Sequence, residues 1–318
     1  MPRSAVRRRR REGIAAELAQ GHGGVVHRAQ LLRLGVTRED VRTEVRAGRW
    51  HLAGRHTVVP AGRNPVGPGR WWWAVWESGS GAILDGVSAL LAQGLSGFHT
   101  ERMDVTVPGR CTAYRLVGVT LHRRREIGPA LSIGVPRARP ESAVIRAAQW
   151  AGSDRQAALL VGMPVQQRLV SPDRLLRAWA EVTRSPRRAL LDSVVRDVCS
   201  GAQSLGELDF ARWCRRYRLP EPNRQSVCRG RSGRVYLDVE WTTHGVVVEI
   251  DGGHHLAGLN PLDDALRSNE LVLDGRRVLR LPVLGLRLEP AAFMAQVARA
   301  LRLPVAVMPN AGDSPRSA

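Results

Sequence analysis

The chain of 318 residues contains no lysine, so all 48 of its basic residues are arginines. Against 29 acidic residues they give a formal net charge of +19. A field of that sign favours polyanionic partners, and the planar guanidinium group pairs well with phosphate oxygens. The composition therefore favours nucleic acid as the partner, and it excludes any reaction that needs a lysine side chain of this chain.

Cysteine and long hydrophobic runs are also scarce. The four cysteines form no CxxC pair, which argues against a disulfide framework and a structural zinc site and favours a reducing compartment. The apolar runs fall short of the roughly 20 residues of a membrane span, and Asp85 interrupts the best of them. Residues 1–15 are basic but lead into no apolar segment, which predicts no secretory signal. We therefore expect a cytoplasmic protein without a membrane partner.

The length suits two or three domains, and the charge is unevenly distributed among them. Residues 1–50 carry 12 arginines against 5 acidic residues, whereas residues 200–303 carry 15 against 12. Segments rich in glycine, proline or serine indicate linkers at 60–69 and around 200–206. The expected architecture is α+β: an N-terminal winged helix-turn-helix (1–60), a mixed α/β middle domain (70–199), a restriction-endonuclease-like α/β domain (200–303) and a disordered tail (304–318).

The N-terminal segment has the element order of a winged helix-turn-helix. Glycines at 21, 23 and 24 separate helices expected over 12–20 and 27–34, and two short strands are expected within 49–54 and 55–59. Between them, Thr37 followed by Asp40 has the spacing of a capping box that opens a third helix. In a winged helix this third helix enters the major groove of DNA.

One face of this third helix is basic. Val41 and Val45 are spaced to face inward, while Arg38, Arg42 and Arg46 form a stripe on the other side. We expect these three arginines and Arg49 to bind DNA. The alternative is a solvated arginine face on an ordinary small helical domain.

Residues 24–59 (GVVHRAQLLRLGVTREDVRTEVRAGRWHLAGRHTVV) resemble the N-terminal domain of AbiEi-type antitoxins. These are winged-helix transcriptional autorepressors of toxin–antitoxin systems. The resemblance implies double-stranded DNA as a partner, and a toxin or a second copy of the chain as a protein partner. The segment after residue 70 resembles the region that follows the winged helix in AbiEi-like proteins.

The middle segment supplies pattern but no chemistry. Tryptophans at 71, 72, 73 and 76 open an apolar helix and are expected in the core, since such clusters are more often packed than used to stack bases. A helical pattern continues over 83–95. Strands are expected at 103–108 and 115–123, and helices over 140–150 and 159–183.

Two alternating segments near the C-terminus bring carboxylates together. In 234–241 the residues Asp238 and Glu240 share one face, and in 245–251 Glu249 and Asp251 do so. Residues 242–245 join the two strands as a short hairpin. Depending on the register, Asp238 lies opposite either Glu249 or Asp251, and directly opposed residues point to the same side of a sheet.

Clustered carboxylates on a half-buried sheet need a counter-charge. Hard oxygen ligands on rigid strands suit Mg²⁺ or Mn²⁺. The alternative is a structural network in which Arg267 or Arg280 neutralises the pair. The neighbouring sequence favours the metal, because His254 and His255 follow Asp251 after two glycines and could transfer protons.

This C-terminal segment resembles the very-short-patch-repair-like domain of the PD-(D/E)XK nuclease superfamily. The motifs that carry the resemblance occur in order over 200–290: SLGELDFARWCRRYRLPEPNRQ, YLDVEW, VVVEIDGGHH, a helix with Asp263, Asp264 and Arg267, and GRRVLRLP. The resemblance implies a metal-dependent DNA endonuclease in which Asp238 and Glu249 hold the metal. It assigns Glu207 to the first-helix acid, His254 and His255 to proton relay, and Arg267 and Arg280 to phosphate contact. Asp251 stands where the superfamily usually has lysine.

Three hypotheses of function follow from the sequence. In the first, the chain binds DNA and hydrolyses its phosphodiester bonds with Mg²⁺ or Mn²⁺. In the second, it is an AbiEi-like regulator or antitoxin whose nuclease-like fold is inactive. In the third, it reads a DNA sequence without cleavage. The geometry of Asp238, Glu249 and a histidine distinguishes the enzyme from the other two.

Overall fold

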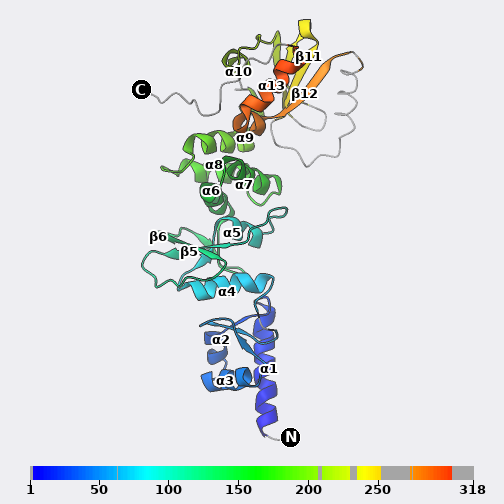
Figure 1. The fold of residues 1–318 in the computed structure, drawn as a ribbon. Coiled ribbons are helices and arrows are strands. Elements are labelled where there is room, and N and C mark those ends of the chain that lie inside the picture. The colour runs from blue at the N-terminus through cyan, green and yellow to red at the C-terminus, as the bar shows by residue number, and fades with distance from the viewer. Residues whose placement is uncertain are drawn as a thin grey trace. The chain divides into compact units, whose positions relative to one another are not determined.

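Figure 1 shows the computed structural model, which describes residues 3–62, 64–206, 210–229, 235–251, 273 and 275–302. The described part is α+β, as expected, and contains three sheets. Contacts divide the chain into two compact units, residues 1–147 and 148–318. Within the described residues, no helix is both long enough and apolar enough to cross a membrane. The expected tail, 304–318, lies outside the described residues.

The first unit begins with three helices and a small antiparallel sheet of strand order β1-β3-β2. Its elements are α1 (Arg3–Gln20), β1 (Val26–His27), α2 (Arg28–Arg33), α3 (Arg38–Arg46), β2 (His51–Leu52) and β3 (Thr57–Val59). The helix expected over 12–20 is the second half of α1. The other expected elements are confirmed, with boundaries shifted by a few residues.

Local sequence explains how α3 begins and how it packs. Thr37 Oγ1 accepts a hydrogen bond from the Asp40 amide at 3.2 Å, and Asp40 Oδ2 accepts from the Thr37 amide at 2.9 Å, which confirms the capping box. Val41 is 3% exposed, in one buried cluster with Leu31 and Trp50. Burying one such aliphatic side chain contributes about 1.5–3 kcal/mol. The inward face of α3 thus holds it against the rest of this unit.

The remainder of the first unit is a five-stranded sheet with helices, in the strand order β6-β5-β4-β8-β7. Its elements are α4 (Pro68–Ser78), β4 (Ile83–Leu84), α5 (Gly86–Ala92), β5 (Met103–Pro108), β6 (Val119–Arg124), β7 (Ala130–Leu131), β8 (Arg137–Ala138) and α6 (Pro140–Trp150), which crosses the boundary between the units. The strands expected at 103–108 and 115–123 correspond to β5 and β6.

Two expectations for this region are corrected. The helical pattern over 83–95 is broken, because Ile83 and Leu84 form a strand and Asp85 caps α5 by accepting the Gly86 amide at 2.8 Å. The four tryptophans of α4 are half-buried rather than fully enclosed. The helix α4 itself begins inside the expected linker 60–69, at Pro68.

The second unit is a helical layer followed by a four-stranded sheet of order β12-β11-β10-β9. Its elements are α7 (Asp154–Gln166), α8 (Pro172–Ala180), α9 (Arg188–Gly206), α10 (Phe210–Arg216), β9 (Arg224–Arg229), β10 (Val235–Trp241), η1 (Thr242–His244), β11 (Val246–Asp251), β12 (Arg277–Pro282), α12 (Val283–Leu288) and α13 (Pro290–Ala300). The segment expected to be helical over 159–183 breaks at Arg168, whose φ is 58°. The expected linker at 200–206 lies within α9.

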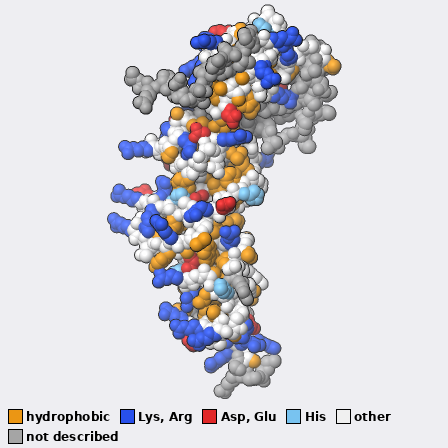
Figure 2. Space-filling model, in the orientation of Figure 1, with side chains coloured by type: hydrophobic (Ala, Val, Ile, Leu, Met, Phe, Trp, Pro, Cys, Tyr) orange, Lys and Arg blue, Asp and Glu red, His pale blue; other side chains and the backbone are white. Residues whose placement is uncertain are grey.

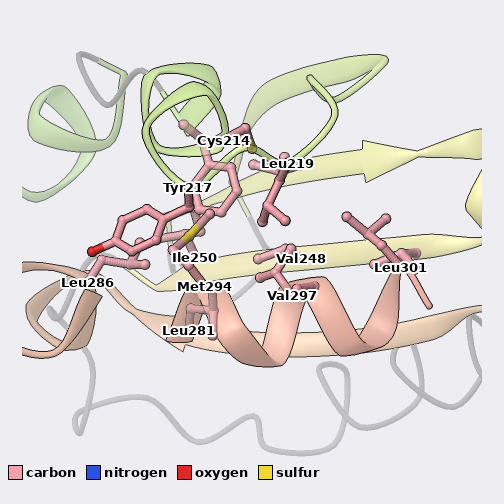
Figure 3. Packing of buried hydrophobic residues seen from close by; sticks show 14 of the residues in the cluster. Cys214, Tyr217, Leu219, Val248, Ile250, Leu281, Leu286, Met294, Val297 and Leu301 are labelled. Carbon is pink, nitrogen blue, oxygen red and sulfur yellow. The ribbon is translucent and has the colours of Figure 1, made fainter. Parts of the chain in front are cut away.

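One face of the four-stranded sheet is buried by α10 and α13 (Figure 3). Val239, Val248 and Ile250 of the strands are fully buried there. From α13, Met294 and Val297 point toward the strands, and Tyr217, which follows α10, belongs to the same buried cluster. Because side chains alternate along a strand, the intervening polar residues are placed on the opposite face.

Candidate functional site

The hairpin of β10 and β11 fixes the position of the predicted carboxylates. In its register Trp241 pairs with Val246 and Asp238 pairs with Glu249, which confirms the first of the two expected arrangements. The connection is the turn Thr242–Gly245, in which Gly245 adopts the left-handed conformation at φ 59°. Asp238 and Glu249 therefore lie side by side on the face turned away from the core.

The neighbouring strands extend this pair into a row across the whole sheet. Ser226 of β9 pairs with Asp238, and Arg280 of β12 pairs with Glu249. We call Ser226, Asp238, Glu249 and Arg280 the polar row. Arg280 Nε donates to Glu249 Oε2 at 3.1 Å, with the Glu249 side chain 12% exposed. The counter-charge that the sequence required is thus present as an arginine.

A second ion pair lies next to the polar row. Glu240 shares the polar face of β10 with Asp238, and its Oε1 accepts a hydrogen bond from Arg276 Nη1 at 2.5 Å. The two arginines that pair with Glu240 and Glu249 come from one segment, since Arg276 directly precedes β12 and Arg280 lies within it. Two of the acidic residues on this face of the sheet are therefore paired with arginines.

The donor set of the polar row agrees with a hard divalent cation. Two carboxylates on adjacent strands provide oxygen ligands, and Mg²⁺ commonly takes one or two carboxylates and completes its shell with water. Asp238 Oδ1 is shielded from solvent. Across the residues that the structure describes, no group of three or more His, Cys, Asp or Glu side chains is placed to hold a metal. A metal here would rest on Asp238 and Glu249 alone among the described ligands.

The other predicted residues of this site are less completely placed. Asp251 is the last residue of β11, and its backbone pairs with Tyr236. Glu207, His254, His255 and Arg267 lie outside the described residues. The structure thus brings together Asp238, Glu249 and Arg280.

Sequence reasoning missed Ser226 and its strand. The segment 224–229 (RQSVCR) is short and mixed in polarity, so its sequence alone does not identify it as a strand. Only the pairing with β10 shows that Ser226 belongs to the row.

The exposed face of α3 carries the predicted arginine stripe. The side chains of Arg42 and Arg46 are 64% and 76% exposed. Arg42 Nη1 lies 3.2 Å from Glu39 Oε2, and Arg46 Nη1 lies 3.6 Å from Glu39 Oε1. Arg38 is exposed as well. All three are therefore free of the core, and blue side chains gather over this part of the molecule in Figure 2.

Arg49 has a different environment from the other three arginines. Its Nε donates at 2.6 Å to Glu44 Oε2, and the Glu44 side chain is 0% exposed. Arg11 of α1 donates to Glu44 Oε1 from both Nε (3.0 Å) and Nη2 (2.6 Å), and to Asp40 from Nη1 at 2.6 Å. Arg11, Asp40, Glu44 and Arg49 thus form a network that joins α1 to α3.

The network also changes the ionisation of its acids. Burial by itself would raise the pKa of Glu44, but the hydrogen bonds and charges of Arg49 and Arg11 outweigh it and hold this pKa below its ordinary value. The pKa of Asp40 is lowered mainly by the hydrogen bond from Thr37. Both carboxylates are therefore charged at neutral pH.

A groove of about 400 Å³ lies beside α3, with a wall made by α2 and the β2–β3 loop. We call it the α3 groove. Its lining contains no acidic residue and six side chains with basic groups: His27, Arg28, Arg38, Arg42, Arg55 and His56. An electropositive groove of this kind attracts anions such as phosphate.

No family model and no curated protein matches the chain. Among solved structures, the crystal structure of the Rv2827c protein from Mycobacterium tuberculosis aligns with 59% of this chain and 73% of its own chain. The aligned residues are 21% identical and the TM-score is 0.33. At that score the likeness carries no argument about fold or function.

Proposed function

We propose that the chain is a DNA-binding protein that contacts duplex DNA through residues 3–59. The observation that carries the proposal is the α3 groove, whose lining contains four arginines and two histidines and no acidic residue. The element order of this segment and its sheet order β1-β3-β2 agree with a winged helix-turn-helix. In such a fold α3 enters the major groove, so Arg38, Arg42 and Arg46 would face the duplex.

Salt dependence of binding tests this proposal. Each phosphate that a protein neutralises contributes about −0.9 to the slope of log K against log salt. In fluorescence anisotropy with a labelled duplex, replacing Arg38, Arg42 and Arg46 by alanine should flatten the slope by about 2–3 units. A charge-matched control replaces the exposed arginines 155, 174 and 177 of the second unit. Equal slopes for the two triple variants would refute the proposed interface.

A second candidate function, DNA phosphodiester hydrolysis, is supported by the polar row. Asp238 and Glu249 are the residues that would hold Mg²⁺ or Mn²⁺, and such an ion, when bound, activates a water for attack on phosphorus. Arg280 reaches Glu249 from the adjacent strand and is half-exposed, which supports a phosphate contact as its role in this proposal. His254 or His255 would transfer the proton in this proposal.

One observation also favours the alternative, an AbiEi-like regulator with an inactive nuclease-like fold. The hydrogen bond from Arg280 to Glu249 already neutralises one carboxylate of the pair. A polar row stabilised in this way needs no metal. On this proposal the second unit serves as a scaffold or contacts a protein partner.

Plasmid nicking separates the two candidates. Cleavage in Mg²⁺ that disappears in EDTA and in the Asp238→Asn variant supports the endonuclease. Glu240→Gln is the matched control, because Glu240 lies two residues away on the same face but is paired with Arg276. Duplex binding without cleavage in either Mg²⁺ or Mn²⁺ supports the regulator.

A further inference from the structure

The loop between β2 and β3, residues 53–56, forms one wall of the α3 groove through Arg55 and His56. Short loops at the surface normally leave their backbone groups to water. This loop instead has its backbone bound by side chains from outside the small sheet, and the helix that supplies most of them is α4.

Glu77 of α4 binds the loop through both carboxylate oxygens. Oε2 accepts the Arg55 amide at 2.7 Å, and Oε1 accepts the amides of His56 and Thr57 and the Thr57 hydroxyl, each at 2.8 Å. Glu77 is 3% exposed. A buried carboxylate is costly unless it is fully hydrogen-bonded, and four donors meet that requirement.

Gly54 makes this approach of the carboxylate possible. A Cβ atom at position 54 would lie 2.4 Å from the Glu77 Cδ, which is closer than real Cβ atoms come to other heavy atoms. The requirement is one of space, because the carboxyl group occupies the position that a side chain would need. The loop sequence and Glu77 are therefore matched to each other.

Two further side chains complete the attachment of the loop. Trp73, one helical turn before Glu77, donates from Nε1 to the Ala53 carbonyl at 2.8 Å. Arg28 of α2 donates from Nη1 to the Arg55 carbonyl at 3.0 Å, and its amide donates to the His56 carbonyl at 2.7 Å. We call Trp73 and Glu77 the α4 clamp.

The clamp fixes where the side chain of Arg55 lies. Because Glu77 binds its amide and Arg28 binds its carbonyl, the exposed Arg55 side chain stays at the rim of the groove. Its guanidinium carbon lies 4.7 Å from the centroid of the Tyr114 ring, a cation–π contact that further limits its freedom. An arginine held in this way loses little entropy when it binds an anion.

We propose that Glu77 is a positioning residue for DNA binding, which holds Arg55 where it contacts a backbone phosphate of the duplex bound at α3. The inference rests on the proposed DNA binding. It also implies that the DNA-binding part of the chain extends through α4, to Ser78, rather than ending near residue 60.

A double-mutant cycle in the full-length chain tests the inference, with binding of a fluorescein-labelled duplex measured by anisotropy over a salt series. Arg55→Ala should flatten the slope of log K against log salt by about 0.9, the contribution of one phosphate. Glu77→Gln should give the same loss, because the glutamine NH₂ group would face the Arg55 amide as a second donor. The double variant should bind as the single variants do, since residues that act through one another are not additive.

The sign of the Glu77 effect distinguishes positioning from bulk charge. Removing a carboxylate from a chain with net charge +19 favours DNA electrostatically. Glu101→Gln, at an exposed site of the same unit, is the control and should leave binding unchanged or slightly stronger. A weaker complex with Glu77→Gln would thus reflect the position of the loop. If Glu77→Gln lowers the melting temperature strongly, Gly54→Ala provides a second way to displace the carboxyl group from the loop.

The outcomes separate this inference from the proposal on which it rests. A wild-type chain that binds no duplex overturns both. A wild-type chain that binds, together with an Arg55→Ala variant of unchanged salt slope, overturns the phosphate contact alone. Additive losses in the double variant would show that Glu77 does not act through Arg55.

Discussion

Replacing the buried acid of the α1–α3 network should destabilise the first unit. Glu44→Ala removes a side chain that is 0% exposed and leaves Arg11, 15% exposed, and Arg49, 38% exposed, without their shared partner. Breaking a buried ion pair costs about 3–5 kcal/mol. Because Arg11 retains Asp40 and Arg49 can turn into water, we expect the lower end, about 3 kcal/mol.

The expected loss is large enough to measure in the full-length chain. For a unit of this size, a loss of 1 kcal/mol in the free energy of unfolding lowers the melting temperature by about 2–4 °C. The calorimetric melting temperature of the first unit should therefore fall by about 6–12 °C. Hydrogen exchange of residues 38–50 assigns the transition to this unit. Glu39→Ala is the matched control on the same helix, since Glu39 is 61% exposed and exposed pairs contribute 1 kcal/mol or less. Equal melting of the two variants would refute the argument.

The pH dependence of stability provides an independent check on the same residue. The folded-state pKa of Glu44 lies below its ordinary value near 4.5. A depressed carboxyl pKa stabilises the fold fully above the unfolded-state pKa, and this contribution is lost as the pH falls through the folded-state value. The wild-type first unit should therefore lose stability below about pH 4.5 more steeply than the Glu44→Ala variant does.

Three further predictions concern the two proposed sites and α2. Mg²⁺ or Mn²⁺ should raise the calorimetric melting temperature of the second unit relative to EDTA, because a ligand that binds the folded state stabilises it by mass action. Asp238→Asn should abolish this shift. Equal melting temperatures in Mg²⁺, Mn²⁺ and EDTA would count against the metal. Without lysine, the proton relay of any cleavage falls to His, Asp or Glu, and an unperturbed histidine titrates near about pH 6.5. If a histidine relays the proton, nicking should rise through pH 6–7 and then level, and His254→Ala or His255→Ala should slow it by about 10²–10⁴-fold. A double alanine variant with wild-type activity would contradict the histidine relay and leave the proton to Asp251 or bulk water. Burial, followed by the charge of His56, lowers the pKa of His27, whose Nδ1 accepts the Ala29 amide at the start of α2. Its stabilisation is present above about pH 6.5 and is lost as the pH falls below that value, so hydrogen exchange of α2 should accelerate in acid in the wild type but not in His27→Asn.

The sequence predicted the parts of the fold that depend on local pattern. The capping box of α3 and the two registers considered for β10 and β11 follow from spacing alone. The structure confirms the capping box, and of the two registers it has the one that pairs Asp238 with Glu249. The polar row could be anticipated as far as Asp238 and Glu249, because opposed positions in a hairpin share a face. Arg280 was one of two arginines, with Arg267, that the sequence offered as the counter-charge.

What the sequence did not reveal depends on contacts between distant segments. Glu77 is one polar residue in an aromatic helix, and nothing nearby indicates that it binds the amides of 55–57. Arg11 sits in a run of arginines, yet it alone of that run pairs with Glu44 among the described contacts. Ile83 and Leu84 follow a helical pattern, but pairing with Thr106 and Val105 makes them a strand. In each case tertiary pairing decided the outcome, and local propensity did not.

The parallel pairing of β11 with β12 sets an order in which the polar row is assembled during synthesis. Asp238 and Glu249 meet as soon as the hairpin closes, whereas Arg280 follows Glu249 by 31 residues in the sequence. At translation rates of about 5–20 residues per second, the arginine is added some 2–6 s after the glutamate. During that interval the two carboxylates meet without the guanidinium group of Arg280, and their mutual repulsion opposes hairpin closure. The ionic composition around the nascent chain should therefore influence when this sheet forms.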